Sequence, residues 1–398
     1  FGVIENIPEG RRQAKVEIPG FPRTDITHPN IRFQQTRVTQ RDMLRMDSMP
    51  LKYHCDDATG RFVPELDPKH GFRRAWNLKK LLGSHENAHV AFTLGVQAVM
   101  GAFLLLVLGG WLNITPVIEY AGSAAWLPTL GAMLALMGFG LFRLNMHLGK
   151  PRRFYRGFNN WRLSPVSREI AGVSLFFAGL AGFSFFNLFP GFPFADLLKP
   201  ASAAAGLLGL GVGGYYMIRL YRIPARPFWN HWHTDAAFVG TSFSLGGLLL
   251  ALLALVVGVL TPKLASLLAT SVGLGLALEA VGLLAHARAF KAAHSEGAAS
   301  FYEQTTTYGY SYWLRNGLLG LSLLLAVAIA VTGNLFLFAP LALAAVAASI
   351  LGRALFYVLV IPTTMPGAFF WRNRGFEEHA RQTGLAAMPQ VGVVMGRH

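Results

Sequence analysis

The chain has 398 residues, of which 53% are hydrophobic and only 14% are charged. Because a soluble domain carries about a quarter charged residues, this composition excludes a set of soluble domains and indicates one integral membrane protein. The net charge of +15 is of the size seen in nucleic-acid-binding proteins. Most of it lies in loops beside apolar segments, where topology signals and docking surfaces occur. We therefore expect no nucleic-acid partner.

Residues 1–85 are polar and are interrupted by prolines from Pro8 to Pro68, which leaves little room for long helices. We expect an extended N-terminal arm here, with a short amphipathic helix near Arg73–Leu82. Scattered apolar residues favour an arm that docks on a partner protein, and a disordered tail is the alternative. These apolar residues are Phe21, Ile31, Phe33 and Leu51.

Eight apolar runs follow, each long enough to cross a hydrocarbon core about 30 Å thick. Each run must satisfy its own backbone hydrogen bonds in lipid, so helices are the only economical structure. The expected fold class is therefore an all-α integral membrane protein, with a transmembrane anchor domain over 86–375 and a C-terminal tail over 376–398. The predicted spans are 88–112, 122–146, 168–189, 199–221, 234–260, 263–288, 313–333 and 336–361.

Eight spans put both termini on one side of the membrane. The connections expected there, 147–167, 222–233 and 289–312, are rich in Lys and Arg, whereas the opposite connections carry only Lys199 and Lys263. By the positive-inside rule the termini are cytoplasmic. The alternative is that the basic face docks an acidic partner, in which case the rule does not apply.

The basic loop between spans 2 and 3 runs from His147 to Glu169. A His with an ordinary pKa near 6.5 can accept a proton from a reduced quinone. Glu169, favourably placed at a helix N-terminus, can accept the second proton or orient the His. Because the loop can bring the two residues together, we predict a quinone site at this membrane surface. The alternative is that His147 is an interfacial anchor and that Glu169 is a helix cap or a partner of Arg168.

Seven histidines at or near the apolar spans all fall on the same side of the membrane. A cytochrome with two stacked haems needs His pairs at two depths, so we expect no haem, and a single haem near the surface is the alternative. Cys55 is the only cysteine. Since an iron–sulfur cluster takes about four thiolates, this chain alone holds none. The histidines concerned are His85, His89, His147, His231, His233, His286 and His294.

The chain also shows signs of duplication. The segment 223–230 after span 4 is similar to 361–373 after span 8, and His147 near the end of span 2 corresponds to His286 near the end of span 6. An even number of spans per unit makes this a parallel repeat, so we expect two four-helix bundles side by side. Chance resemblance between membrane sequences is the alternative.

Glu279 and Arg353 lie deeper in their spans. Each is about nine residues from the basic end of its span, which at 1.5 Å per residue is roughly 13 Å into the membrane. Equal depth and opposite sign predict an ion pair between spans 6 and 8, because an unpaired charge there is costly. A structural bridge and a proton path are the two interpretations.

Several motifs resemble those of the membrane anchor subunit of dimethyl sulfoxide reductase. The resemblance covers about residues 84–398 and is carried by His147-Leu148-Gly149-x-Pro151, Ser167-Arg168-Glu169-Ile170, Phe92-Thr93 with Gln97, Pro224-Ala225-Arg226-Pro227 and Gly352-Arg353-x-Leu355-Phe356-Tyr357. It implies eight helices, no haem, and electron exchange between menaquinone or ubiquinone and a four-cluster iron–sulfur subunit. It also implies a catalytic partner that holds a molybdenum or tungsten bis-pterin, with this chain expected to be a non-catalytic anchor. By motif the quinone-binding residues are His147 and Glu169, with Arg168, Gly149, Pro151 and Arg152 beside them.

The residues before the first span depart from the family pattern. Thr27–Phe33 resembles the tail of an iron–sulfur subunit, which makes the arm a candidate for the end of a fused iron–sulfur domain. The basic face favours the sulfite dehydrogenase branch, which keeps its catalytic subunit inside and reduces quinone. We expect a multi-pass protein of the bacterial inner membrane. A structural scaffold or a secondary transporter is the alternative function, although a transporter would have broken helices and polar groups near the midplane.

Overall fold

A computed structural model describes residues 3–6, 31–34, 50–56, 61–66, 78–84, 86–147, 150–291, 293 and 295–360. Eight of its helices are long and apolar enough to cross a membrane, which confirms the all-α membrane class. Their ends differ from the expected ends by a few residues, as for the second span, which begins at Trp126. The spans are α2 (Asn87–Trp111), α4 (Trp126–His147), α5 (Pro165–Leu188), α6 (Ala195–Arg219), α7 (His233–Val257), α8 (Pro262–Lys291), α10 (Gly309–Thr332) and Leu335–Val358, which combines η3 (Leu335–Leu337) with α11 (Phe338–Val358).

Local signals begin and end several of these helices. Pro165 opens α5, and the Ser164 side chain accepts a hydrogen bond from the backbone N–H of Ser167, as in a standard N-cap. At the other end of a span, α7 stops at Gly258 with φ 79° and α10 stops at Gly333 with φ 66°. Glycine adopts this left-handed conformation without a Cβ clash, so these two residues terminate their helices.

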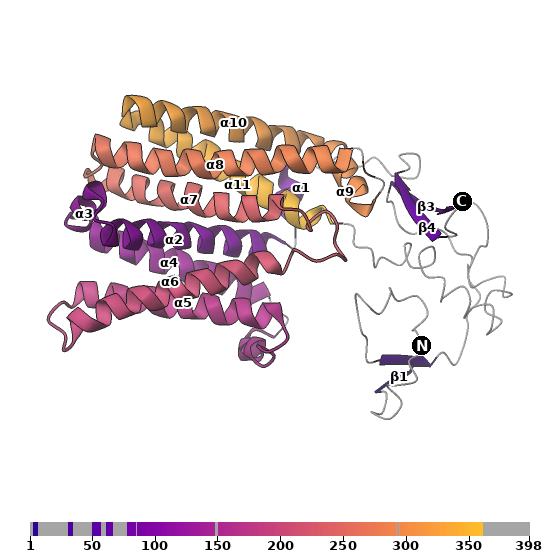
Figure 1. The fold of residues 1–398 in the computed structure, drawn as a ribbon, viewed down its shortest axis with the longest axis horizontal. Helices are drawn as coiled ribbons and strands as arrows, with labels where there is room; N and C mark the ends of the chain where they lie inside the picture. Colours follow the sequence, from indigo (N-terminus) through magenta and orange to yellow (C-terminus); the bar gives the residue numbers. More distant parts are fainter. Residues whose placement is uncertain are drawn as a thin grey trace.

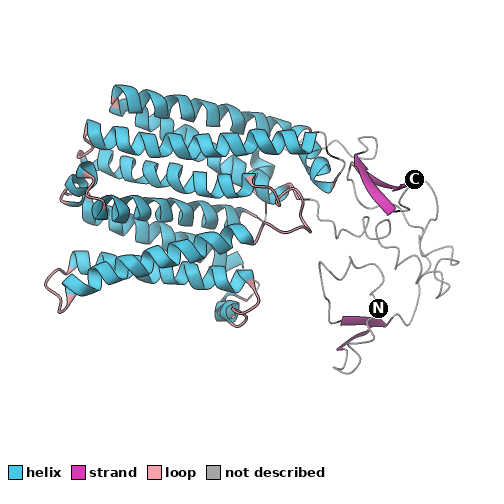
Figure 2. Ribbon diagram, viewed as in Figure 1, coloured by secondary structure: helices cyan, strands magenta, loops and turns pink. Residues whose placement is uncertain are grey.

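The spans run roughly side by side, with α2 in the interior of the bundle (Figures 1 and 2). Within its apolar window 83% of α2 is buried, against 28% for α4, because α2 packs on both α4 and α7. Helices α5 and α6 pair closely, as do α7 and α8, while α10 packs on α8 and α11. The two predicted four-helix sets are thus α2–α6 and α7–α11 in sequence order, and their relation by a repeat stays a prediction.

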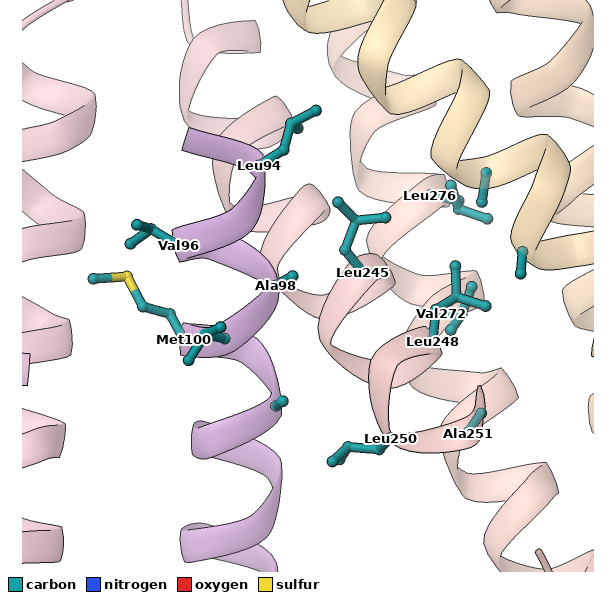
Figure 3. Close-up of a cluster of buried hydrophobic side chains, with 14 of the residues drawn as sticks. Leu94, Val96, Ala98, Met100, Leu245, Leu248, Leu250, Ala251, Val272 and Leu276 are labelled. Atoms are coloured by element: carbon teal, nitrogen blue, oxygen red, sulfur yellow. The ribbon is translucent and has the colours of Figure 1, made fainter. Parts of the chain in front are cut away.

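The apolar core lies where α2, α7 and α8 meet. Side chains from these helices, including Leu94, Leu245 and Leu276, fill the space between them (Figure 3). Small residues allow the backbones to approach closely. A Cβ added to Gly101 would lie 1.7 Å from the backbone oxygen of Ser242, and one added to Gly246 would lie 2.5 Å from the nitrogen of Ala102. Glycine at these crossings therefore sets the distance between α2 and α7.

Short elements occupy the two ends of the bundle. We call the end at which α2 begins and α11 ends the terminal face. It carries η2 (Pro151–Phe158) and α9 (Glu296–Thr305), and the opposite face carries α3 (Thr115–Ala121) (Figure 1). A cavity of about 250 Å³ lies toward the opposite face among apolar residues of α2, α3, α7 and α8.

Parts of the predicted arm form defined structure. Strand β1 (Val3–Asn6) pairs antiparallel with β2 (Ile31–Gln34), and β3 (Leu51–Asp56) pairs antiparallel with β4 (Arg61–Leu66). The expected short helix appears as α1 (Leu78–Leu82), with residues 73–77 outside the described part. Strand β4 contacts α9 and α1 contacts α11, so the arm touches its own bundle. Docking on a partner and the domain boundaries stay predictions, and the C-terminal tail lies outside the described residues.

Candidate functional site

The side chains of two histidines and a tyrosine form a row in space at the terminal face. The ring of His147, the exposed last residue of α4, lies 5.0 Å from the ring of His89 in an edge-on arrangement. His89 is in the first turn of α2, and its ring lies 5.7 Å from that of Tyr357 near the end of α11. The three side chains thus run from the surface into the bundle, and three different helices position them.

Tyr357 contacts a second tyrosine. Its hydroxyl is 2.9 Å from the hydroxyl of Tyr221, in the connection between α6 and α7. Aromatic side chains surround the pair. Trp229 stacks on Phe356 with ring centroids 5.1 Å apart, and its indole N–H donates a hydrogen bond to the Phe356 carbonyl at 2.7 Å. These contacts hold the connection between α6 and α7 against α11, and they surround the two hydroxyls with aromatic side chains.

Glu169 lies near this tyrosine pair. It is only 8% exposed, although it is in the second turn of α5 beside an exposed loop. Burial raises the pKa of Tyr221 well above its usual value, and the neighbouring Tyr357 and Glu169 raise it further. The Tyr221 phenol is therefore a neutral hydrogen-bond donor at physiological pH. The described contacts do not join His147 directly to Glu169, because His89, Tyr357 and Tyr221 lie between them.

A buried guanidinium closes the inner side of the cluster. Arg353 donates a hydrogen bond from Nη2 to Oε1 of Gln97 at 2.8 Å, and the same nitrogen is 3.4 Å from the Thr241 hydroxyl. Its guanidinium lies 3.7 Å from the ring centroid of Phe238, while Nη1 has no hydrogen-bonding partner among the described groups. Arg353 therefore links α11 to α2 and α7 directly beneath the tyrosines.

The predicted ion pair between Glu279 and Arg353 is wrong, because Glu279 pairs with a different arginine. Glu279 is ion-paired with Arg315 of α10, with 3.8 Å between Oε1 and Nη1, and both side chains are buried. Glu279 does face α11, since a Cβ added to Gly352 would lie 3.6 Å from its Oε1. Arg353 projects instead toward α2, where its Nη2 donates a hydrogen bond to the amide oxygen of Gln97. Glu279 and Arg353 do lie at similar depth, but the rotation of each helix about its axis brings Arg315, and not Arg353, to Glu279.

The loop residues predicted beside the site have separate roles. Arg168 donates from Nε to the Trp161 carbonyl at 2.9 Å and from Nη1 to the Tyr216 hydroxyl at 3.0 Å, so it ties the loop to α5 and α6. Pro151 begins η2, and Arg152 is exposed within it. Gly149 lies outside the described residues. Contact of these loop residues with a quinone stays a prediction.

The described residues hold no group of three or more His, Cys, Asp or Glu arranged to bind a metal ion. The cluster at the terminal face instead combines hydroxyl, imidazole, carboxyl and guanidinium groups with aromatic walls. Such a set can hold a planar, polar ring and can exchange protons with it.

Comparison with known proteins identifies the family of this chain. The family model for the DMSO reductase anchor subunit, DmsC, matches residues 81–359. The chain belongs to this family.

Two curated members are similar over their aligned parts. The C subunit of the anaerobic dimethyl sulfoxide reductase of Haemophilus influenzae is 31% identical over 176 residues, which cover 42% of this chain and 58% of that protein. The C subunit of the Escherichia coli reductase is 31% identical over 183 residues, which cover 44% of this chain and 60% of that protein. The matched part therefore spans less than two thirds of either relative.

Several members of the cluster in this DmsC-family protein were not predicted as site residues. His89 was one of many histidines assigned to the terminal face, and nothing in its spacing distinguished it. Gln97 and Tyr357 belong to the family motifs, but their contacts depend on helix packing. Arg315 is a charge six residues into an apolar span, and this is the signal that could have identified it.

Proposed function

We propose that this chain is the quinone-binding membrane anchor of a molybdenum or tungsten bis-pterin oxidoreductase. In this proposal it exchanges electrons between membrane quinone and a four-cluster iron–sulfur subunit, and it has no catalytic centre of its own. The observation that carries the proposal is the cluster of His147, His89, Tyr357, Tyr221 and Glu169 at one membrane surface. Family membership supports it independently.

The chemistry of the described residues suits a quinone ring. One of the two tyrosine hydroxyls donates to the other, which leaves the second hydroxyl and the free Nη1 of Arg353 to donate to carbonyl oxygens, and Phe356 and Trp229 supply apolar walls. A bound quinol supplies two electrons and two protons on oxidation. His147 is exposed to solvent, so it can pass a proton between the site and water. Glu169 is buried beside the tyrosines and can hold a proton or orient the ring.

The remaining assignments follow from the same proposal. The protein is a multi-pass protein of the bacterial inner membrane with cytoplasmic termini, because the basic connections lie at the terminal face. Its exposed loop carries Arg152, Arg153 and Arg156 on η2, a surface suited to an acidic iron–sulfur partner. The catalytic partner acts on a sulfur compound such as sulfite or dimethyl sulfoxide.

The test uses the assembled complex with the variants His147→Ala and Glu169→Gln. Both are expected to lower quinol-linked turnover by on the order of a hundredfold, the usual contribution of a positioned acid or base. Electron transfer from an artificial donor to the catalytic subunit should be unchanged. Glu119→Gln is the matched control, since Glu119 is exposed on α3 at the opposite face. Normal quinol kinetics in both site variants would contradict the proposal.

A further inference from the structure

A second polar row lies outside the proposed quinone cluster, along one face of α8. Glu279, Gly282 and His286 follow one another at helical spacing, so they share this face. His286 is only 3% exposed, and its Nε2 lies 3.0 Å from the carbonyl oxygen of Phe228. Two ionisable groups are thus placed along a buried stripe that ends at the terminal face.

His233 of α7 lies beside this stripe, next to Gly282. A Cβ added to Gly282 would lie 2.8 Å from the Ala236 Cβ and 3.2 Å from Cδ2 of His233, so these two side chains pack on this glycine. The ring centroids of His233 and His286 are 4.9 Å apart. Nε2 of His233 is buried and has no hydrogen-bonding partner among the described groups. An unsatisfied buried nitrogen of this kind is costly unless a water or a proton carrier serves it.

The row reaches the surface at His231. Its ring is 5.3 Å from that of His286, and its Nδ1 accepts a hydrogen bond from the backbone N–H of His233 at 3.1 Å. Burial lowers the pKa of His231, with a further lowering from Arg222 and an opposing effect from Asp235. His231 is therefore neutral at physiological pH and can accept a proton at the membrane surface.

The inner end of the row lies against α11, the helix that carries Tyr357. Glu279 is ion-paired with Arg315 and packs against α11 at Gly352, next to Arg353. Tyr357 lies one turn further along α11, about 6 Å by helical rise. The charged or titratable groups that face the row are thus Arg315 from α10, Arg353 from α11, and the ion pair of Arg222 with Asp235 at the surface.

We propose that Glu279, His233, His286 and His231 form a second proton branch between the quinone cluster and the terminal face. This inference rests on the proposed quinone function. Oxidation of one quinol sends two electrons to the iron–sulfur partner and releases two protons. One proton leaves by His147, and the other passes by Tyr357 and Glu279 to the histidines. Both exits open on the same face, so the branch moves no charge across the membrane.

A first experiment tests proton binding without quinone turnover. Infrared difference spectra of the full protein are recorded on acidification, and the carboxylic-acid band is assigned with Glu279→Asp. We expect Glu279 to gain a proton, with a midpoint that moves in His233→Gln and Gly282→Ala. The matched control is Gly273→Ala on the same helix, where the nearest neighbour of an added Cβ is the Ala326 Cβ at 3.7 Å. If Glu279 shows no titrating band, or if Gly282→Ala and Gly273→Ala behave alike, the proposal is overturned.

A second experiment measures proton release by the assembled complex with a pH-sensitive dye after a pulse of quinol. His233→Gln and Gly282→Ala should slow one of the two protons by on the order of tenfold or more and raise the solvent isotope effect. Gly273→Ala should leave both protons unchanged. Equal release of both protons in all variants would refute the branch. If the unaltered complex neither oxidises quinol nor reduces quinone, the proposed function is refuted instead, and the infrared titration would still decide whether the row binds protons together.

Discussion

The hydroxyl of Tyr221 lies 2.9 Å from the hydroxyl of Tyr357, and this contact joins the connection after α6 to the last turn of α11. The pair therefore connects the two sequence halves of the bundle at the terminal face. Glu169 and His89 approach it from α5 and α2. A substitution here affects both the junction of the halves and the proposed quinone cluster.

Tyr357→Phe removes one hydroxyl and leaves the Tyr221 phenol without this partner. We expect a loss of about 1–3 kcal/mol in the free energy of unfolding, the usual cost of an unsatisfied buried group, together with slower quinol turnover. Denaturation of the purified protein and turnover of the complex measure the two effects. Tyr310→Phe is the control, because Tyr310 is 68% exposed. Equal behaviour of the two variants would mean that the tyrosine pair contributes nothing.

Gly101→Ala should separate α2 from α7. The added Cβ would lie 1.7 Å from the Ser242 oxygen, a backbone atom that cannot rotate away. The expected loss is about 1–3 kcal/mol, as for other overpacked sites. By contrast, Gly131→Ala places its Cβ in open space and should stabilise α4 by about 0.5–1 kcal/mol through helix propensity. Thermal melting of the two variants should therefore shift in opposite directions.

Glu279→Gln should leave the Arg315 guanidinium buried without a counter-ion. Breaking a buried pair in this way typically costs about 3–5 kcal/mol. The double variant Glu279→Gln with Arg315→Met should recover part of the loss, since it removes the stranded charge. Glu279→Gln with Arg353→Met should recover less, because Arg353 is held by Gln97. If stability recovers in the Glu279→Gln, Arg353→Met double variant but not in the one with Arg315→Met, Arg353 is the true partner.

Stability of the protein should fall as the pH drops below about 6.5, the ordinary pKa of histidine. The pKa of His231 is lowered in the folded protein, chiefly by burial. Between the folded and unfolded pKa values the unfolded state binds more protons, so acid favours unfolding there and higher pH restores stability. Melting temperatures across this range should depend less on pH in His231→Gln than in the unaltered protein. Parallel curves for the two proteins would contradict the assignment.

The purified protein should contain no haem. The described histidines of the membrane domain all lie toward the terminal face, as His89, His147, His231, His233 and His286. Two stacked haems need His pairs at two depths. An absorption spectrum should therefore lack a Soret band, and a stoichiometric haem signal would revive a cytochrome function.

Hydropathy alone located the eight spans and the all-α class, because a bilayer admits only segments that satisfy their own backbone and are apolar over their length. The motif order was enough to indicate the family, and the basic connections, including the loop from His147 to Glu169, marked the terminal face. These features are local, so each can be read from a short stretch of sequence.

Tertiary structure decided which side chains meet. Glu279 pairs with Arg315 and not with Arg353, and His147 reaches Glu169 only through His89, Tyr357 and Tyr221. Such partners depend on helix order and on rotation about each helix axis. In this bundle glycine crossings such as Gly101 on Ser242 allow the helices to approach closely enough for these contacts. Because lipid and protein core are equally hydrophobic, the hydropathy of a span does not show which of its faces points into the bundle. Helix packing therefore determines the contacts.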